Sequence, residues 1–280
     1  MSFLVLKKDI PIIQNLMTKN NTYSFHSTDK EKDFLLNKEK MGKDWYYYDK
    51  EIEYKFNSWG YRSTEFDELG DDFIVTFGCS STEGIGLHYD DMWSTKLGKE
   101  LNCKVLNLGV GSTGIDFQYY NTILLHNYLM SINKKPKYVI YQWPAQERTT
   151  ASFLYKENKL DRLNFEPFSV HFDEDNSRRE LKDFYHWYKT GFIEDEGELL
   201  RQSIFQPMVC NNLWNSFGVN VINWTWEGLY VNKINNIIKF NFEIQHIIDD
   251  VKYWARDLGH NGHTAQDKVV NILLEKIKNL

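Results

Sequence analysis

The sequence predicts an α/β chain built around a parallel β-sheet, and three observations point to it. A short β-rich run occurs three times between residues 73 and 142, and each run ends at turn-forming residues. Helix-compatible sequence follows the first two runs, and a helical pattern of apolar residues closes the chain. Strands that alternate with helices in this way are typical of βαβ units, in which the strands lie parallel. We therefore expect a parallel sheet with helices packed against it.

Each element is predicted from its own local pattern. The first strand reads Phe-Ile-Val-Thr-Phe and stops at Gly78, and the third follows Pro136. The last helix carries apolar residues at helical spacing from Val269 to Ile277. The expected elements, in chain order, are strands at 73–77, 104–108, 138–142 and 219–224, and helices near 90–101, 115–132, 178–190, 197–215 and 265–277.

Two segments fall outside this rhythm. Residues 1–56 have no sustained periodicity, but an aromatic run at 45–48 and alternation at 52–56 predict a β-hairpin that covers one edge. Residues 150–216 contain acidic clusters and the two helices near 178–190 and 197–215, which indicates an inserted cap over the carboxyl ends of the strands. The predicted organisation is an N-terminal extension at 1–56 and an α/β domain at 57–280 with a helical insert at about 150–216.

Composition excludes several classes of protein. A chain of 280 residues with 42 % hydrophobic and 26 % charged residues and a mean hydropathy of −0.54 is neither disordered nor embedded in a membrane. Its 33 basic and 39 acidic side chains give a net charge of −6 and no basic block, so we expect no nucleic-acid partner and no membrane partner. Three scattered cysteines and the lack of a signal-peptide pattern favour a cytoplasmic protein. The sequence does not reveal the oligomeric state.

Candidate chemical groups follow the strands, where ligands of open parallel sheets bind. Ser80 comes after the first strand, a glycine-rich turn at 109–114 after the second, and Gln146 after the third. Asp257 and His260 lie three residues apart just before the last helix. Serine hydrolysis needs a hydroxyl on a tight turn, an imidazole, a carboxylate that orients it, and amide donors for the oxyanion. Each part has a candidate here.

These blocks resemble the SGNH (GDSL-like) hydrolase superfamily over roughly residues 57–280, apart from the insert. Gly-Cys-Ser at 78–80 is similar to the Gly-Asp-Ser block of that family, and Arg-Asp-x-x-His-x-Gly at 256–262 is similar to its closing block. The segment Asn57-Ser58-Trp59-Gly60-Tyr61-Arg62 resembles the Asn-x-x-Gly-aromatic-Arg lead-in found before the nucleophile in many members.

The resemblance implies a flavodoxin-like, doubly wound αβα domain that hydrolyses carboxylic esters without a cofactor or metal. It implies Ser80 as nucleophile, His260 as base, and Asp257 as the residue that orients the base. The oxyanion hole would be formed by the amides of Ser80 and of Gly111 or Ser112, with the Gln146 side chain. The implied substrate is a small-molecule or glycan ester, such as an acetylated sugar. The chain departs from the family at Cys79, where the family has aspartate, and at Gln146, where it has asparagine.

Other interpretations remain open at this point. A catalytically weakened member could bind a glycan or a protein through the same cleft, and a flavodoxin-like fold could bind a nucleotide or flavin. Cys79 could be a nucleophile, although a small residue beside a tight turn is more often part of the packing. Aromatic residues such as Trp143 and Trp226 could stack on sugars or belong to the core. Arg148 could pair with nearby acids or face an anionic substrate.

Overall fold

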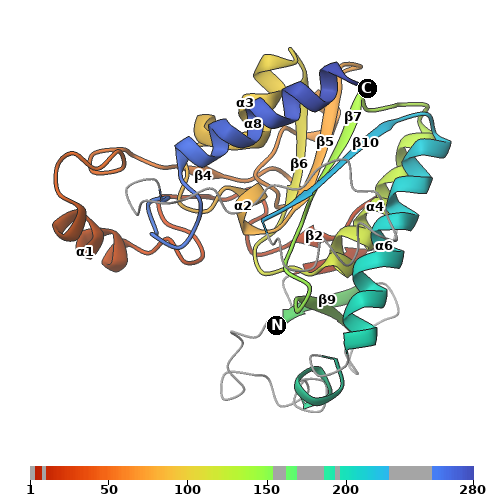
Figure 1. Cartoon of the computed structure of the whole chain (residues 1–280), viewed down its shortest axis with the longest axis horizontal. Coiled ribbons are helices and arrows are strands. Elements are labelled where there is room, and N and C mark those ends of the chain that lie inside the picture. Colours follow the sequence, from red (N-terminus) through yellow and green to blue (C-terminus); the bar gives the residue numbers. More distant parts are fainter. Residues whose placement is uncertain (1–3, 8–10, 154–161, 169–185, 193–195, 227–253) are drawn as a thin grey trace.

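The computed structural model describes residues 4–7, 11–153, 162–168, 186–192, 196–226 and 254–280, and a four-stranded parallel sheet lies at its centre (Figure 1). The strands follow the order β10-β7-β5-β6. Their bounds are Phe73–Gly78 for β5, Lys104–Gly109 for β6, Tyr138–Trp143 for β7 and Asn220–Thr225 for β10. The four strands predicted from the sequence are confirmed to within one residue at each end.

The order of the strands fixes where a site can form. β5 comes first in the chain among the four, yet it lies between β6 and β7, so the chain winds away from β5 in both directions. The crevice beyond the carboxyl ends of β5 and β7 is therefore the topological switch point of the sheet, where ligands bind in doubly wound folds. β5 is buried along its whole length because helices cover both faces.

Two pairs of helices enclose the sheet, which confirms the predicted doubly wound αβα architecture (Figure 1). α3 (Trp93–Glu100) and α8 (His263–Lys278) lie together on one face, over a cluster that includes Ile74 and Val269. α4 (Ile115–Ser131) and α6 (Glu196–Ser216) lie together on the other face. The predicted helices near 90–101, 115–132 and 265–277 are thus confirmed.

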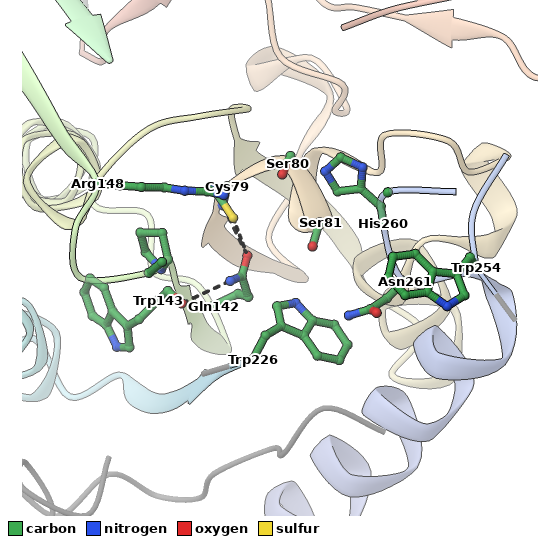
Figure 2. A pocket seen from close by; sticks show the side chains of 13 residues that line it. Cys79, Ser80, Ser81, Gln142, Trp143, Arg148, Trp226, Trp254, His260 and Asn261 are labelled. Atoms are coloured by element: carbon green, nitrogen blue, oxygen red, sulfur yellow. Dashed lines mark hydrogen bonds between the residues drawn. The ribbon is translucent and has the colours of Figure 1, made fainter. Parts of the chain in front are cut away.

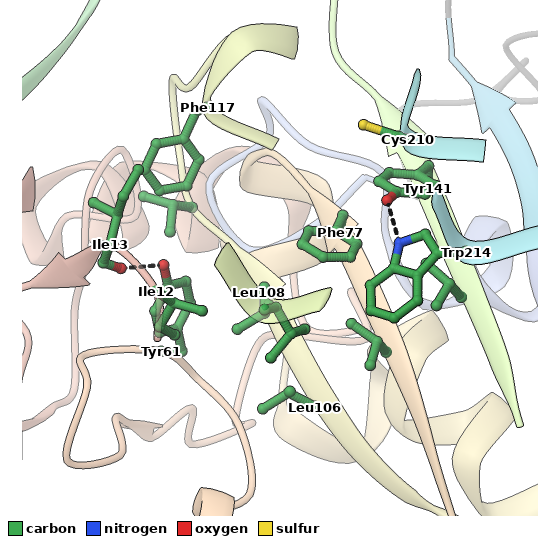
Figure 3. Packing of buried hydrophobic residues seen from close by; sticks show 14 of the residues in the cluster. Ile12, Ile13, Tyr61, Phe77, Leu106, Leu108, Phe117, Tyr141, Cys210 and Trp214 are labelled. Carbon is green, nitrogen blue, oxygen red and sulfur yellow. Dashed lines mark hydrogen bonds between the residues drawn. The ribbon is translucent and has the colours of Figure 1, made fainter. Parts of the chain in front are cut away.

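Aromatic side chains fill the layer between the sheet and the second pair of helices (Figure 3). Phe77 and Tyr141 stack with their ring centroids 4.8 Å apart. The Tyr141 hydroxyl accepts a hydrogen bond from Trp214 Nε1 at 2.8 Å and shares another with Thr122 Oγ1 at 2.6 Å, so its polar tip is satisfied inside the core. Burial raises the pKa of the nearby Cys210 thiol to about 12, which makes this cysteine a packing residue.

The insert differs from the prediction because its first part forms strands. β8 (Thr149–Phe153) and β9 (Arg162–Phe168) pair antiparallel, and β9 also pairs with β1 (Leu4–Lys7). β1 in turn pairs with β2 (Gln14–Asn15), which completes a second sheet. Local pattern did not reveal these strands, since β9 also pairs with β1, a strand far from it in the sequence.

The two helices predicted in the insert have different outcomes. The helix at 197–215 exists as α6, but it packs on α4 and β10 and is the connection between β7 and β10 rather than a cap over the strands. Its buried residues Cys210 and Trp214 fit the apolar face of the sheet. The helix near 178–190 falls mostly outside the described residues, and a π-helical turn, η5 (Tyr188–Phe192), follows within them.

The N-terminal extension does not form the predicted hairpin. β3 (Thr22–Tyr23) pairs with β4 (Tyr54–Lys55), and α1 (Glu31–Met41) lies between them in the chain. The aromatic run at 45–48 contributes Trp45 and Tyr47 to a third buried cluster, together with Ile85, Leu87 and Ala255. The extension therefore packs beside the loop before α8. Two 3₁₀ turns, η1 (Phe66–Glu68) and η2 (Tyr89–Asp91), complete the described elements. No helix among them is both long and apolar enough to cross a membrane.

Candidate active site

Ser80 stands at a tight turn beyond the carboxyl end of β5, as the first residue of the short helix α2 (Ser80–Glu83). A Cβ atom on Gly78 would lie 2.0 Å from Thr82 Oγ1, and one on Gly109 would lie 2.5 Å from Glu83 N. Glycine at both positions therefore lets α2 sit directly against the ends of β5 and β6. This strand-turn-helix geometry leaves the Ser80 side chain partly exposed at the edge of the sheet.

His260 lies on the loop before α8, and Asp257 holds its ring. His260 Nδ1 lies 2.6 Å from Asp257 Oδ2. Asp257 Oδ1 accepts hydrogen bonds from the backbone N–H of Gly259 at 3.1 Å and of His260 at 3.2 Å. Because Nδ1 faces the carboxylate, Nε2 is the ring nitrogen left for proton transfer, and it bonds to no residue that the structure describes.

The charge on Asp257 is stabilised although its side chain is fully buried. Burial raises the pKa of the Asp257 carboxyl. The hydrogen bond and charge of His260 and the hydrogen bond from Thr28 together lower this pKa by more, so it lies below its ordinary value. Thr28 Oγ1 donates to Asp257 Oδ2 at 2.6 Å. An ionised carboxylate at this place can orient the imidazole and stabilise its protonated form.

A buried ion pair ties this loop to the N-terminal extension. Arg256 donates from Nη2 to Asp29 Oδ2 at 2.6 Å and from Nε to both carboxylate oxygens at 3.0 Å. The two side chains are 3 % and 1 % exposed, and Tyr54 donates a further hydrogen bond to Asp29. Arg256 precedes Asp257, so this pair helps to hold the loop that carries Asp257 and His260. Sequence reasoning missed Asp29 and Thr28, since neither lies in a motif and both are distant from Asp257 in the chain.

The same loop docks on the segment that follows Ser80. Arg256 N donates to Gly86 O at 3.0 Å, and Ala255 N donates to His260 O at 2.8 Å. A Cβ on Gly86 would lie 2.8 Å from Ala255 Cβ and 3.0 Å from Asp257 Oδ1, so glycine there permits close approach. The fold thereby brings the two distant blocks of sequence to one place.

Ser80 and His260 both line a pocket of about 220 Å³ (Figure 2). No hydrogen bond joins Ser80 Oγ to His260 among the described residues. Catalytic hydrogen bonds are often long without substrate and tighten when it binds. The lining residues are Cys79, Ser80, Ser81, Gln142, Trp143, Pro144, Ala145, Arg148, Trp226, Trp254, Gly259, His260 and Asn261.

The candidate oxyanion donors do not all remain available. Gly111 N already donates to Glu83 Oε2 at 2.6 Å, and Glu83 Oε1 lies 3.0 Å from His26 Nε2. Ser112 takes a left-handed conformation with φ of 65°, and its amide donates to no described residue. A Cβ atom added to the neighbouring Gly111 would lie 3.8 Å from Ser80 Cβ, so this turn lies close to Ser80. Of the two glycine-rich-turn candidates, Ser112 is the one with a free N–H.

Gln146 is not among the residues that line the pocket, whereas Gln142 is. Gln146 is buried, and its Nε2 atom has no partner among the described residues. Gln142 Oε1 accepts from Cys79 N at 3.2 Å and from Thr82 Oγ1 at 3.1 Å, which ties β7 to the Ser80 turn. The Cys79 thiol also contacts this oxygen and is buried, which fits the packing interpretation. Gln142 was missed because its place inside a predicted strand indicated a core residue.

The wall opposite His260 follows β7 and carries Trp143 and Arg148 (Figure 2). Asp116, at the start of α4, anchors this segment by accepting from Thr149 Oγ1 and from Thr150 N, both at 2.7 Å. Burial raises the pKa of Asp116 to about 6, against the lowering effect of those bonds. In the part of the chain that the structure describes, no group of three or more His, Cys, Asp or Glu side chains could hold a metal ion.

Comparisons with known proteins give similarity at the level of solved structures alone. No protein-family model matches the sequence, and no curated protein matches it. An acetyl xylan esterase from the rumen bacterium Butyrivibrio proteoclasticus is similar, with 11 % identity, a TM-score of 0.44, and coverage of 74 % of this chain and 63 % of that one. A family two carbohydrate esterase from Clostridium thermocellum, solved with cellohexaose, has 11 % identity and a TM-score of 0.46, covering 75 % of this chain and 64 % of that one.

A further carbohydrate esterase has 12 % identity and a TM-score of 0.41, covering 75 % of this chain and 65 % of that one. This chain therefore spans less than two thirds of the length of the three matched chains. Similarity at this level leaves the chemistry to be inferred from the residues of the chain itself.

Proposed function

We propose that the protein is a serine ester hydrolase of the SGNH type that cleaves carboxylic esters. One observation carries the proposal: the Asp257–His260 pair, joined at 2.6 Å, lines the same pocket as Ser80 on the tight turn after β5. The sequence resemblance at 78–80 and at 256–262 supports it independently.

The mechanism has two steps. Ser80 Oγ attacks the ester carbonyl while His260 Nε2 takes the hydroxyl proton, and Asp257 stabilises the imidazolium. The tetrahedral intermediate collapses to an acyl-Ser80 ester, and the alcohol leaves with the proton from His260. His260 then takes a proton from water as the water oxygen attacks the acyl carbon. The second tetrahedral intermediate collapses, His260 returns the proton to Ser80 Oγ, and the carboxylic acid leaves.

Backbone amides stabilise the oxyanion in both steps. The amides of Ser80 and Ser112 are the donors we propose, since the Gly111 amide is held by Glu83. Gln146, which is not among the residues that line the pocket, has no role in this proposal. Two donors in place of three lower the rate, because loss of one donor typically costs about 10²–10³-fold in turnover.

The size of the pocket favours a short acyl group on a larger molecule. A volume of about 220 Å³ is below the roughly 300–1,000 Å³ of pockets that enclose a whole small molecule. The acyl group would lie beside Ser80, and the alcohol part would lie along the wall that carries Trp143 and Arg148 and extend out of the pocket. An acetylated sugar meets this requirement.

Hydrolysis of 4-nitrophenyl acetate tests the proposal. The wild-type protein is expected to release nitrophenolate, and Ser80→Ala to lower kcat by about 10⁴-fold or more, since the covalent path is lost. Ser81→Ala is the matched control, because Ser81 lines the same pocket from the next position and has no assigned role. Equal rates for wild type and Ser80→Ala would contradict the proposal.

A binding module is the second candidate, and two observations favour it. Ser80 Oγ makes no hydrogen bond to His260 among the described residues, and Glu83 occupies the Gly111 amide. A protein of this kind would bind an acylated glycan without turnover. Binding measured by calorimetry, together with the absence of any acetate release over hours, would select this candidate over the esterase.

A further inference from the structure

The charge of the pocket is unlike that of the whole chain. The chain has a net charge of −6, yet the described residues that line the pocket include one permanent cation, Arg148, and no carboxylate. Asp257 lies behind His260 with a fully buried side chain and does not line the pocket. A ligand that enters therefore meets a local positive charge.

Arg148 also has no partner among the residues that the structure describes. Its guanidinium makes no hydrogen bond and no ion pair with the described residues, and its Nε atom is buried without an acceptor. Arg62 also has a buried Nε without an acceptor, but its two Nη atoms donate to three backbone carbonyls, and Arg256 donates to Asp29. A buried donor without an acceptor costs free energy, so an acceptor supplied by a ligand would be bound favourably.

The backbone that carries Arg148 is held in place. Arg148 N donates to Ala145 O at 3.1 Å, and Tyr188 donates from its hydroxyl to Glu147 O at 2.7 Å. A Cβ on Gly114 would lie 2.5 Å from Arg148 O, so α4 begins directly against this residue. The side chain is thus presented from a fixed position, which reduces the entropy lost when it binds a ligand.

A bound anion would lie beside Arg148, on the side of the pocket that faces His260. Arg148 and His260 approach the Ser80 turn from opposite sides (Figure 2). Trp226 lines the pocket too, and its indole N–H is buried without an acceptor among the described residues. Two donors that lack acceptors, beside flat aromatic surfaces, match a sugar ring that bears a carboxylate.

We infer that Arg148 selects esters of acidic sugars, in which the sugar carries a carboxylate close to the acylated hydroxyl. This inference rests on the proposed esterase function. The planar guanidinium can bind one carboxylate through two parallel hydrogen bonds. Arg148 is the single permanent cation among the described lining residues, which favours a ligand with one negative charge over a phosphate dianion. The carboxylate would fix the ring so that its acyl group points to Ser80.

Three acetylated methyl glycosides test this directly: a glucuronide, the glucoside with a hydroxymethyl group in place of the carboxylate, and the methyl ester of the glucuronide. The wild type is expected to show the highest kcat/KM for the free acid. Arg148→Gln is expected to lower the ratio of kcat/KM for the acid over the glucoside by about tenfold to a hundredfold, the typical value of a charge-assisted hydrogen-bonded pair. Arg148→Lys, which keeps the charge and loses the fork, should fall between the two.

Lys104→Gln is the matched control, because it removes one positive charge at the exposed amino end of β6, away from the pocket. It is expected to leave all three kcat/KM values unchanged. Equal kcat/KM values of the wild type for acid and glucoside, or an unchanged ratio in Arg148→Gln, would overturn the inference while the esterase stands. A sulfated glucoside preferred over the glucuronide would also overturn the choice of a carboxylate.

Binding separates this inference from the proposed function. If no substrate is hydrolysed, the esterase proposal fails, and calorimetry with the deacetylated methyl glucuronide then decides the inference alone. Binding by the wild type that weakens at least tenfold in Arg148→Gln, with an unchanged circular dichroism spectrum, would support it. Absence of binding by the wild type would overturn it.

Discussion

The two walls of the pocket differ in how their charges are satisfied. On the His260 wall, Asp257 faces an imidazole and two backbone amides, and Arg256 beside it is paired with Asp29. On the opposite wall, Arg148 has no partner among the described residues, although the backbone around it is anchored through Asp116. Residues that perform chemistry need fixed orientation, whereas a residue that recognises a ligand needs an unoccupied binding group. The His260 wall therefore fits the proposed catalytic role, and the Arg148 wall fits the proposed role in ligand recognition.

The pKa values of Asp257 and Asp116, one on each wall, shift in opposite directions. Asp257 is buried beside a partner that can carry a positive charge, and its pKa is lowered. Asp116 is buried among neutral donors, and burial raises its pKa to about 6. Burial alone thus does not decide the charge of a carboxyl group, because the nature of the neighbouring donors decides it.

The largest expected effect concerns Asp257. Asp257→Asn is expected to lower kcat on 4-nitrophenyl acetate by about 10⁴-fold, because the amide favours the wrong tautomer of His260 and cannot stabilise the imidazolium. Steady-state kinetics with a circular dichroism control measures it. A loss of less than tenfold would show that the His260 wall is not the catalytic one.

The next effect is on stability. Asp29→Ala leaves Arg256 buried without its partner and is expected to lower the free energy of unfolding by about 3–5 kcal/mol. Asp49→Ala removes the exposed partner of Lys38 and is the control, with an expected change within about 0.5 kcal/mol. Urea denaturation measures both. Similar values for the two variants would mean that the buried pair does not hold the loop.

A smaller effect depends on pH and comes from Asp116. Its pKa in the folded state lies above the unfolded value, so the folded state binds the proton more tightly and Asp116 favours folding most at acidic pH. As the pH rises from about 4 to about 6, the free energy of unfolding of the wild type relative to Asp116→Asn should fall by up to about 1.4 kcal/mol per pH unit. Denaturation across this range measures the difference, and parallel curves for the two proteins would contradict it.

Asp257 predicts the opposite slope at lower pH. Its folded-state pKa lies below the unfolded value, so its contribution to stability is present above the ordinary pKa of a carboxyl group and is lost as the pH falls through the folded-state value. The same titration carried below pH 4 should therefore show Asp257→Asn losing less stability than the wild type as acid is added.

The smallest effect sharpens the positioning role of the N-terminal extension. Thr28→Val removes the hydroxyl that donates to Asp257 and is expected to lower kcat by up to about tenfold with KM unchanged, since one hydrogen bond to a charged group is lost. Thr28→Ser keeps the hydroxyl and should restore the rate. If Thr28→Ser is as slow as Thr28→Val, then Thr28 acts through packing rather than through Asp257.

Local sequence pattern was enough to predict part of the fold and part of the candidate site. The four sheet strands and the helices α3, α4 and α8 follow from apolar periodicity and turn residues within short windows. Asp257 and His260 could be paired from their spacing, because three residues on one loop bring the two side chains together. Ser80 could be placed at the sheet edge, since the carboxyl ends of parallel strands meet there.

The remaining features depend on contacts between distant segments. Nothing near Asp29 or Thr28 indicates that they meet Arg256 and Asp257 at the other end of the chain. β9 was missed because its partner β1 lies near the N-terminus. Local pattern also could not predict that Glu83 accepts the hydrogen bond of the Gly111 amide. Nor could it predict that Arg148 has no partner among the described residues, because both depend on tertiary packing.

Labelling with a fluorophosphonate shows whether Ser80 is a nucleophile activated by His260, because this reagent reacts with a serine that a neighbouring imidazole has activated. We expect one phosphonate adduct per chain on the peptide that contains Ser80, with release of fluoride, and a much slower reaction in His260→Ala. Absence of an adduct, or an adduct at another residue, would contradict it.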